Sequence, residues 1–107
     1  MMDGPVPRPI TQEERSLIAS ILSASHSNTP VPSEGALVRP LSDGGMGSLS
    51  FDLVGDRRFG RVVGDREFTD KDGVPVFASV YADIDGNLFE LDMFKGDFSA
   101  VLQLPAD

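Results

Sequence analysis

The stretch VPVFASVYADIDGNLFELDMF, residues 74–94, consists of two apolar segments joined by the tetrapeptide DIDG. In the second segment, Phe89, Leu91 and Met93 alternate with polar residues, which indicates a half-buried strand. Asp-x-Asp-Gly is typical of a three-residue hairpin loop in which the glycine, here Gly86, adopts a positive φ. These residues therefore predict an antiparallel hairpin, and its register decides whether Tyr81 faces Glu90.

The same alternation of strand and turn extends back from this hairpin to residue 36. Further strands are predicted at ALVRPL, SLSFDLV and RFGRVVGDREF, residues 36–41, 48–54 and 58–68. The turns DGGMG, GDRR and DKDG follow them in that order, and Gly73 in DKDG is expected to share the positive φ of Gly86. Pro40 has no N–H to donate, which favours an edge position for its strand. Four turns joining five strands predict a mostly antiparallel meander.

One helix is predicted ahead of the strands. In TQEERSLIASIL, Thr11 and Glu14 have the spacing of a capping box, and four apolar residues share one face: Leu17, Ile18, Ile21 and Leu22. We therefore expect a helix over residues 12–24, preceded by an extended lead-in over residues 1–10, which holds three prolines. Because a sheet must bury at least one face, the helix is expected to pack across it. The prediction is a single α+β domain over residues 11–107, with a core that includes Leu17, Ile21, Phe51, Val80 and Leu91.

The glycine-rich stretch DGGMGSLSF, residues 43–51, allows two interpretations. A phosphate cradle needs backbone amides that converge at a helix N-terminus, usually with a lysine to meet the charge. Here no lysine follows, the glycine spacing differs from that of phosphate loops, and the next predicted element is a strand. The sequence therefore favours a hairpin corner, with a positive φ at Gly44, Gly45 and Gly47 and with Met46 covering the end of the sheet.

Composition narrows the classes of partner. The chain has 107 residues, no cysteine and a net charge of −8, from 17 acidic and 9 basic side chains. Such a surface repels phosphate backbones and anionic lipid, so we expect no nucleic-acid or membrane binding, and basic proteins or cations are the natural partners. The absence of cysteine excludes disulfides, zinc–thiolate sites and a thiol nucleophile. No secretory signal or membrane span is apparent, so we expect a cytoplasmic protein.

Two acidic residues are the strongest candidates for chemistry. Glu90 and Asp92 stand two apart on one strand, which puts them on one face with Cα atoms about 6.5–7 Å apart. This separation would suit a general acid and base, and a small hydrolase or isomerase could add Tyr81 from the neighbouring strand. The alternative is an ordinary solvated face opposite Phe89, Leu91 and Met93.

Other candidates are weaker. Asp70, Asp72, Asp83 and Asp85 lack EF-hand spacing, although two neighbouring turns could hold one calcium ion between them. His26 lies in a Ser/Pro loop, where we expect it to be exposed rather than part of a catalytic triad. Four arginines lie close together in sequence and are expected to pair with neighbouring carboxylates: Arg57, Arg58, Arg61 and Arg66. The prediction includes no catalytic residue, metal or cofactor.

Four blocks carry a resemblance to a known family. RPITQEE, DGGMGSLSF, FTDKDGVPV and GNLFELDMFKGDF, in this order, resemble an uncharacterised family of small acidic bacterial proteins, a domain of unknown function. The resemblance spans nearly the whole chain after residue 7. One departure is Phe94, at a position where the family pattern would have tryptophan. The resemblance implies an intact bacterial domain and supplies no reaction.

The sequence leaves two functional hypotheses. The first is a protein-binding domain, of the kind that acts as an immunity-type inhibitor of a basic partner, and the second is the carboxylate-based enzyme described above. For the first, the expected partner-facing surface combines acidic and aromatic side chains with one lysine: Glu90, Asp92, Phe94, Lys95, Asp97 and Phe98. The alternative for Phe94 and Phe98 is that they cap the core. The sequence leaves the partner and the oligomeric state open.

Overall fold

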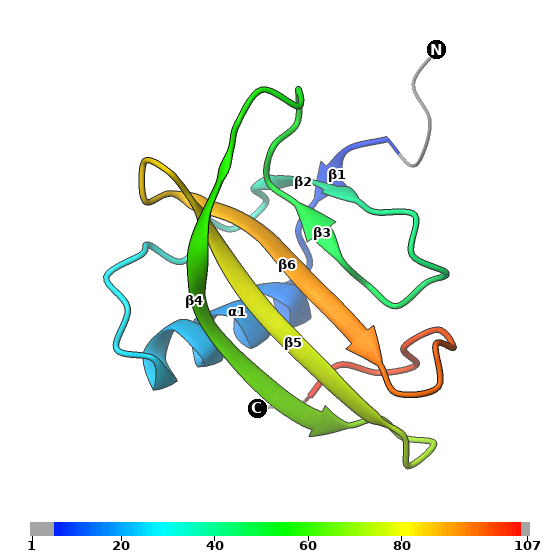
Figure 1. Ribbon diagram of the computed structural model, residues 1–107. Helices are drawn as coiled ribbons and strands as arrows, with labels where there is room; N and C mark the ends of the chain where they lie inside the picture. The colour runs from blue at the N-terminus through cyan, green and yellow to red at the C-terminus, as the bar shows by residue number, and fades with distance from the viewer. Residues whose placement is uncertain (1–5, 106–107) are drawn as a thin grey trace.

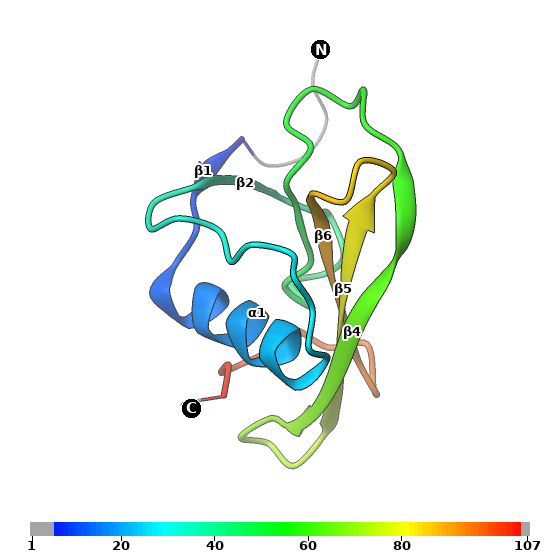
Figure 2. The ribbon, with the colours of Figure 1, turned by 90° about the vertical axis from the view of Figure 1, so that its left-hand side faces the viewer.

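The computed structural model describes residues 6–105 and consists of two layers, one helix and one antiparallel sheet. Helix α1 spans Gln12–Ala24 and lies across one face of the sheet, behind it in Figure 1 and beside it in Figure 2. The sheet has six strands: β1 (Arg8–Pro9), β2 (Leu37–Pro40), β3 (Leu49–Ser50), β4 (Phe59–Thr69), β5 (Pro75–Asp83) and β6 (Leu88–Lys95). We call the face that packs on α1 the inner face and the opposite one the outer face. The α+β architecture with one helix is therefore confirmed.

Helix α1 begins where the capping box predicts. The Thr11 hydroxyl accepts the Glu14 N–H at 3.1 Å, and the Glu14 carboxylate accepts the Thr11 N–H at 2.9 Å. Arg8 adds a two-pronged ion pair to Glu14, with nitrogen–oxygen distances of 2.8 and 3.0 Å. The extended segment ahead of the helix is therefore tied to its first turn. Of the lead-in predicted for residues 1–10, residues 1–5 lie outside the described residues, and Arg8–Pro9 forms β1.

The core lies between α1 and the inner face. Along β5, Val76, Ala78, Val80 and Ala82 are fully buried, as the period of a strand requires. Leu17 and Ile21 meet them from the helix, and Leu91 meets them from β6. Four of the five predicted core residues are thus buried. Phe51, the fifth, is half-buried at the edge of this cluster.

The sheet has six strands rather than the predicted five. The predicted meander is also wrong in one place, because one pair of successive strands does not lie side by side. The strand order is β1-β2-β3-β6-β5-β4, so β6 lies between β3 and β5, and β3 does not pair with β4. Strand β3 ends at Ser50 because the next residues turn away: the Asp52 carboxylate accepts the N–H groups of Gly55 and Arg57 at 2.8 and 3.0 Å. The Arg57 guanidinium then bonds the carbonyls of Phe51 and Leu88 and the Asp83 carboxylate. These long-range contacts fix residues 51–58 as a loop.

The turns follow the sequence prediction. Gly73 and Gly86 have φ of 84° and 85°, and each is the last residue of a three-residue loop. The Asp70 N–H donates to the Val74 carbonyl across the first loop, and the Asp83 N–H donates to the Asn87 carbonyl across the second. The stretch DGGMG joins β2 to β3 as a turn, with positive φ at all three of its glycines. In this turn the Asp43 carboxylate accepts the amides of Met46 and Ser48. A phosphate would have to compete with this carboxylate, so the turn interpretation is confirmed.

Candidate functional site

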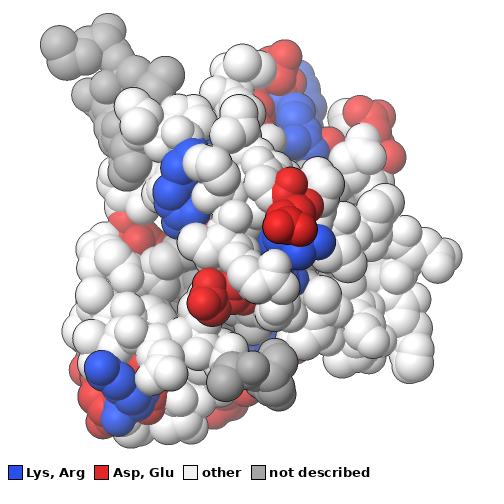
Figure 3. Space-filling view, turned by 180° about the vertical axis from the view of Figure 1, so that it is seen from behind, with Lys and Arg blue, Asp and Glu red and all other residues white. Residues whose placement is uncertain are grey.

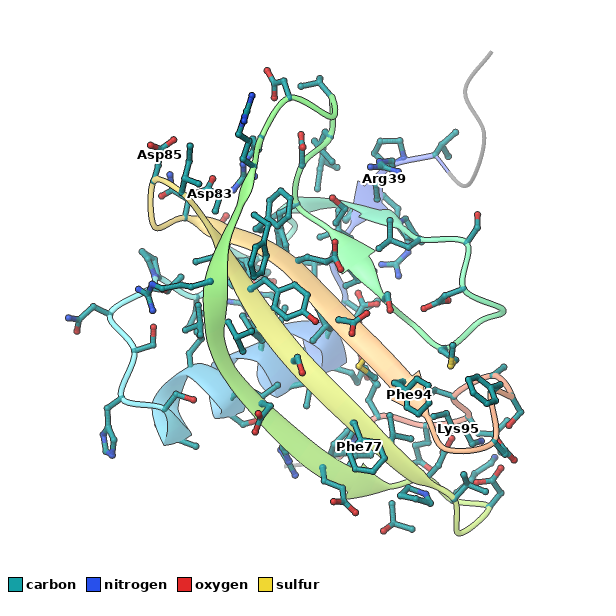
Figure 4. The ribbon with its side chains drawn as sticks, in the orientation of Figure 1. Arg39, Phe77, Asp83, Asp85, Phe94 and Lys95 are labelled. Atoms are coloured by element: carbon teal, nitrogen blue, oxygen red, sulfur yellow. The ribbon has the colours of Figure 1, made fainter. Side chains whose placement is uncertain are left out.

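The outer face carries no helix, and its side chains form rows across the strands (Figure 4). Pairing sets three such rows: Val62, Tyr81, Glu90 and Ser50; Asp65, Ser79 and Asp92; and Glu67, Phe77 and Phe94. Arg39 of β2 extends the first row beyond Ser50. Four carboxylates therefore share the outer face with several aromatic rings.

The acidic centre of this face is built by β5 and β6. Tyr81 lies directly opposite Glu90, which answers the question of register, and its hydroxyl donates to Asp92 at 3.2 Å. Burial and then the Asp92 charge raise the pKa of Glu90. Burial and then Asp92 also raise the pKa of Tyr81. The site thus holds two carboxylates that repel each other, Glu90 and Asp92, and the Tyr81 hydroxyl donates a hydrogen bond to the second of them.

An aromatic group lies at one end of the same face. Phe77 and Phe94 have ring centroids 6.3 Å apart, and Phe98 meets Phe94 edge to face at 5.1 Å. All three rings are exposed, by 42%, 41% and 67% of their residue surfaces. The ladder directs Phe77 and Phe94 away from the core, so these rings do not cap it. Phe98 also has φ of 65°, a conformation that is unusual for a bulky residue.

Lys95 does not belong to this surface, which corrects the sequence prediction. Strand alternation puts it on the inner side with Leu91 and Met93, and it is fully buried (Figure 4). Its ammonium lies 2.9 Å from Asp70 and 2.6 Å from Asp72, and it donates to the Ala100 carbonyl at 3.0 Å. The buried cation therefore anchors the DKDG turn and the C-terminal segment to the sheet.

Asp70 completes this buried ion cluster. Its carboxylate accepts the N–H groups of Leu102 and Gln103 at 2.8 and 3.1 Å. Burial alone would raise the pKa of Asp70, but the Leu102 N–H, the Lys95 ammonium and the Lys71 N–H together lower it to about 2. With the pKa of Asp70 lowered and that of Lys95 raised, these two groups form an ion pair at neutral pH, and the role of the cluster is structural.

The remaining predicted partner residue lies in the turn after β6. Asp97 is exposed, and its carboxylate accepts both the N–H and the hydroxyl of Ser99, which lowers its pKa. Of the predicted surface, Glu90, Asp92, Phe94 and Phe98 lie together on the outer face, and Asp97 lies in the turn beside Phe98.

Sequence reasoning missed the contribution of β4. Asp65 and Glu67 extend the acidic face to the edge of the sheet, opposite Ser79 and Phe77. Counting back from the three-residue DKDG turn would have found them, because that turn pairs Thr69 with Pro75 and so sets each pair back to Gly64 and Val80. Arg39 was also missed, since nothing local indicated that β2 would join β6 through β3.

The other sequence candidates do not gather into a site. The two Asp-rich turns are not neighbours, because they lie at opposite ends of β5, and this overturns the idea of a shared calcium ion. Within residues 6–105, no three acidic or histidine side chains are grouped as metal ligands would be. His26 is exposed, as expected. Arg57 pairs with Asp83 at 2.7 Å, also as expected. Arg66 donates a hydrogen bond to the Ser20 hydroxyl on α1.

Five hollows formed by the described residues, of about 170 to 440 Å³, are lined by residues other than Tyr81, Glu90 and Asp92. One of about 170 Å³ lies between the DGGMG turn, β6 and residues 101–104. Another, of about 350 Å³, is lined by residues 25–29, Arg61, Val63 and Gly86. Figure 3 shows the side away from the outer face, where basic and acidic side chains are scattered in small groups over a mainly uncharged surface. Glu90 and Asp92 therefore lie on the outer surface of the sheet rather than in one of these hollows.

Comparison with known proteins gives one match. Searches of curated proteins and of solved structures find no similar protein. Among residues 6–105, no helix has the length and apolar character needed to cross a bilayer. One family model matches residues 7–105, which is nearly the whole chain. The chain therefore belongs to the family described as a domain of unknown function, DUF6984.

Proposed function

We propose that this protein is a binding domain that captures a basic protein partner on the outer face of its sheet, as an immunity-type inhibitor in the bacterial cytoplasm would. The observation that carries the proposal is the combination of four carboxylates and three exposed phenylalanines on one uncovered face. Aromatic anchors surrounded by polar groups are characteristic of interfaces. The net charge of −8 would steer a basic partner toward this face.

The backbone at Phe98 supports the same proposal. A left-handed conformation costs an L-residue about 1–2 kcal/mol. Two-thirds of the Phe98 surface is exposed, so burial within the chain offsets little of this cost. Strained residues of this kind are concentrated at ligand contacts, where the binding energy offsets the strain. The edge-to-face contact with Phe94 holds both rings ready for a partner.

The test uses the chain as bait in a lysate of its source cells. Wild-type protein and the Glu90→Gln/Asp92→Asn variant are immobilised side by side and washed at low and high salt. We expect a basic protein that wild type retains at about 50 mM salt and releases at about 500 mM, because exposed charges are screened over a shorter distance as salt rises. The double variant should retain much less of it.

A matched control separates local from general electrostatics. Glu13→Gln/Glu34→Gln removes the same charge from exposed positions in α1 and in the loop before β2. The control should retain the partner as wild type does. If the control and the outer-face variant lose it equally, or if neither loses it, the outer face is not the binding surface and the proposal fails.

A carboxylate-based hydrolase or isomerase remains the second candidate, because Tyr81, Glu90 and Asp92 do lie together. Catalysis by such a pair benefits from a site that excludes water. The five hollows described above are lined by other side chains, so the geometry favours binding. Turnover of a hydrolysable substrate that is lost in Glu90→Gln and Asp92→Asn would favour the enzyme instead.

A further inference from the structure

Strand β4 forms one edge of the sheet and is its longest strand, with eleven residues. Its two irregularities in register lie between Phe59 and Gly64. From Gly64 to Thr69 the pairing with β5 is regular. Long, regular edge strands offer unpaired backbone groups to another chain, and proteins usually protect them. The second half of β4 therefore needs an explanation.

Hydrogen-bond alternation identifies which groups are unpaired along this edge. Asp70 N–H bonds to Val74, so these two residues form a hydrogen-bonded pair. Pairs alternate along an antiparallel ladder, and even-numbered residues back to Gly64 therefore bond toward β5. The N–H and C=O groups of Asp65, Glu67 and Thr69 point away from the sheet. Their side chains lie on the outer face and are exposed.

The rest of the fold leaves this part of the edge accessible. Helix α1 lies on the inner face, and the loop after it reaches β4 at Gly64, where a Cβ would overlap the Ser25 hydroxyl. Figure 2 looks toward this edge, and no ribbon crosses the half of β4 that leads to the DKDG turn. Residues 103–105 line a hollow together with Phe68, Thr69 and Lys71, so the chain approaches this edge at its Thr69 end. An incoming strand could thus pair with Asp65 and Glu67 without moving another element, and at Thr69 it would lie beside residues 103–105.

Charge decides what kind of strand fits. Pairing of two copies through β4 about a two-fold axis allows five registers of Asp65, Glu67 and Thr69. In three of them Asp65 faces Asp65, Asp65 faces Glu67 or Glu67 faces Glu67, and carboxylates directly opposite each other are destabilising. In the other two, Glu67 or Thr69 faces Thr69, and the copies overlap by three residues of this segment or fewer. A second copy of this chain is therefore disfavoured. A segment with Lys or Arg at two alternate positions would instead place one cation opposite each carboxylate.

We propose that the free edge of β4, from Asp65 to Thr69, accepts an extended basic segment of the partner as a seventh strand, with Lys or Arg opposite Asp65 and Glu67. This inference rests on the proposed function and adds the mode of recognition. Main-chain hydrogen bonds supply affinity in strand addition, and alternate side chains supply specificity. The added strand continues the rows that carry Ser79, Asp92, Phe77 and Phe94.

The experiment uses full-length ¹⁵N-labelled protein and a capped octapeptide of alternating Lys and Thr. On binding, the amide protons of Asp65, Glu67 and Thr69 should become protected from hydrogen exchange. The amides of Arg66 and Phe68, which already bond to β5, should change little. The variant Asp65→Asn/Glu67→Gln should weaken binding by about 2- to 30-fold, because each opposite-charge pair across strands contributes about 0.2–1 kcal/mol.

Two methylated peptides supply the control for backbone pairing. In the first peptide the backbone nitrogens of the lysines are methylated, which blocks the hydrogen bonds to β4 and should abolish binding. In the second peptide the backbone nitrogens of the threonines are methylated, which leaves these hydrogen bonds intact. If both methylated peptides bind equally and only Glu90 and Asp92 change their chemical shifts, strand addition is overturned. The proposed binding face is then left in place. No protection at about millimolar peptide would also overturn strand addition. The proposal is also overturned if the same amides are protected without peptide and this protection increases with protein concentration. That result would indicate that a second copy of the chain occupies the edge.

Discussion

Lys95 shows at the scale of one residue why alternation outweighs average burial preferences. It continues the inward series of Leu91 and Met93, so the strand carries it into the core although lysine is rarely buried. The two carboxylates and the Ala100 carbonyl then satisfy its ammonium. Strict counting along β6 would have predicted its position, whereas the sequence prediction ended the strand at Phe94 and assigned Lys95 to the partner-facing surface.

Removing this cation should be costly. Lys95→Met leaves Asp70 buried without its counterion, and such a loss typically lowers the free energy of unfolding by about 3–5 kcal/mol. Lys95→Met/Asp70→Asn should recover part of the loss, because the one carboxylate left without its cation, Asp72, is about one-third exposed to solvent. Urea unfolding of the two variants and wild type measures the difference. A double variant that is as unstable as the single one would show that the ion pair is not the cause.

The same cluster predicts a response to acid. The pKa of Asp70 is about 2 in the folded protein, below its ordinary value of 3.8, so the folded state holds this carboxylate in its charged form. Its contribution to stability is fully present above about pH 4 and is lost as the pH falls toward 2. Urea midpoints measured across this range should fall less steeply in Asp70→Asn than in wild type. Parallel curves would contradict the assignment.

Phe98 allows binding and stability to be separated. Phe98→Gly removes the unfavourable φ and the edge contact with Phe94, two effects of opposite sign and about 1 kcal/mol each. The free energy of unfolding should therefore stay within about 1 kcal/mol of wild type, while partner retention falls. If Phe98 capped the core instead, its removal would cost about 3–5 kcal/mol. Thermal unfolding together with the capture assay checks both.

At the scale of elements, turns and close backbone approaches set the register on which the outer face depends. Gly60 lies in the irregular part of β4, and a Cβ there would overlap the Asp83 carbonyl oxygen. Gly86 has open space around it but a positive φ. Gly60→Ala should cost about 1–3 kcal/mol by overpacking, and Gly86→Ala about 1 kcal/mol through backbone strain. Chemical denaturation would rank them, and the reverse order would contradict this account.

These elements also show what the sequence can predict. Helix α1 was predictable from a capping box and a 3.6-residue period, and the β4–β5–β6 hairpins from alternation and two DxDG turns. All of these features are local. The insertion of β6 beside β3 was not predictable, because it depends on Arg57, which joins Phe51, Asp83 and Leu88 across 31 residues of chain. By contrast, Asp65 and Glu67 lie in the regular half of β4, so their place on the acidic face was predictable by counting from the DKDG turn.

At the scale of the whole molecule, the acidic face opposes folding. Glu90 and Asp92 repel each other, and the raised pKa of Glu90, caused first by burial and then by Asp92, means that folding favours its protonated form. Stability from this group is therefore greatest below its ordinary pKa and is lost as the pH rises through the raised value.

Glu90→Gln should accordingly stabilise the fold at pH 7, by up to about 1 kcal/mol, while weakening partner binding. The free energy of unfolding and the retained partner are measured on the same preparation, with Glu13→Gln as the control for charge alone. A variant that is less stable than wild type would show that Glu90 supports the fold rather than the interface.

The position of β6 has a consequence for how the protein is made. Among the described residues, the strand that joins β3 to β5 is the last to be synthesised. Until residues 88–95 emerge, β1, β2 and β3 have no partner in the rest of the sheet, and one edge of β5 remains unpaired. The core also lacks Leu91 and Met93 until then, so the two parts of the sheet become one unit only when β6 enters between β3 and β5.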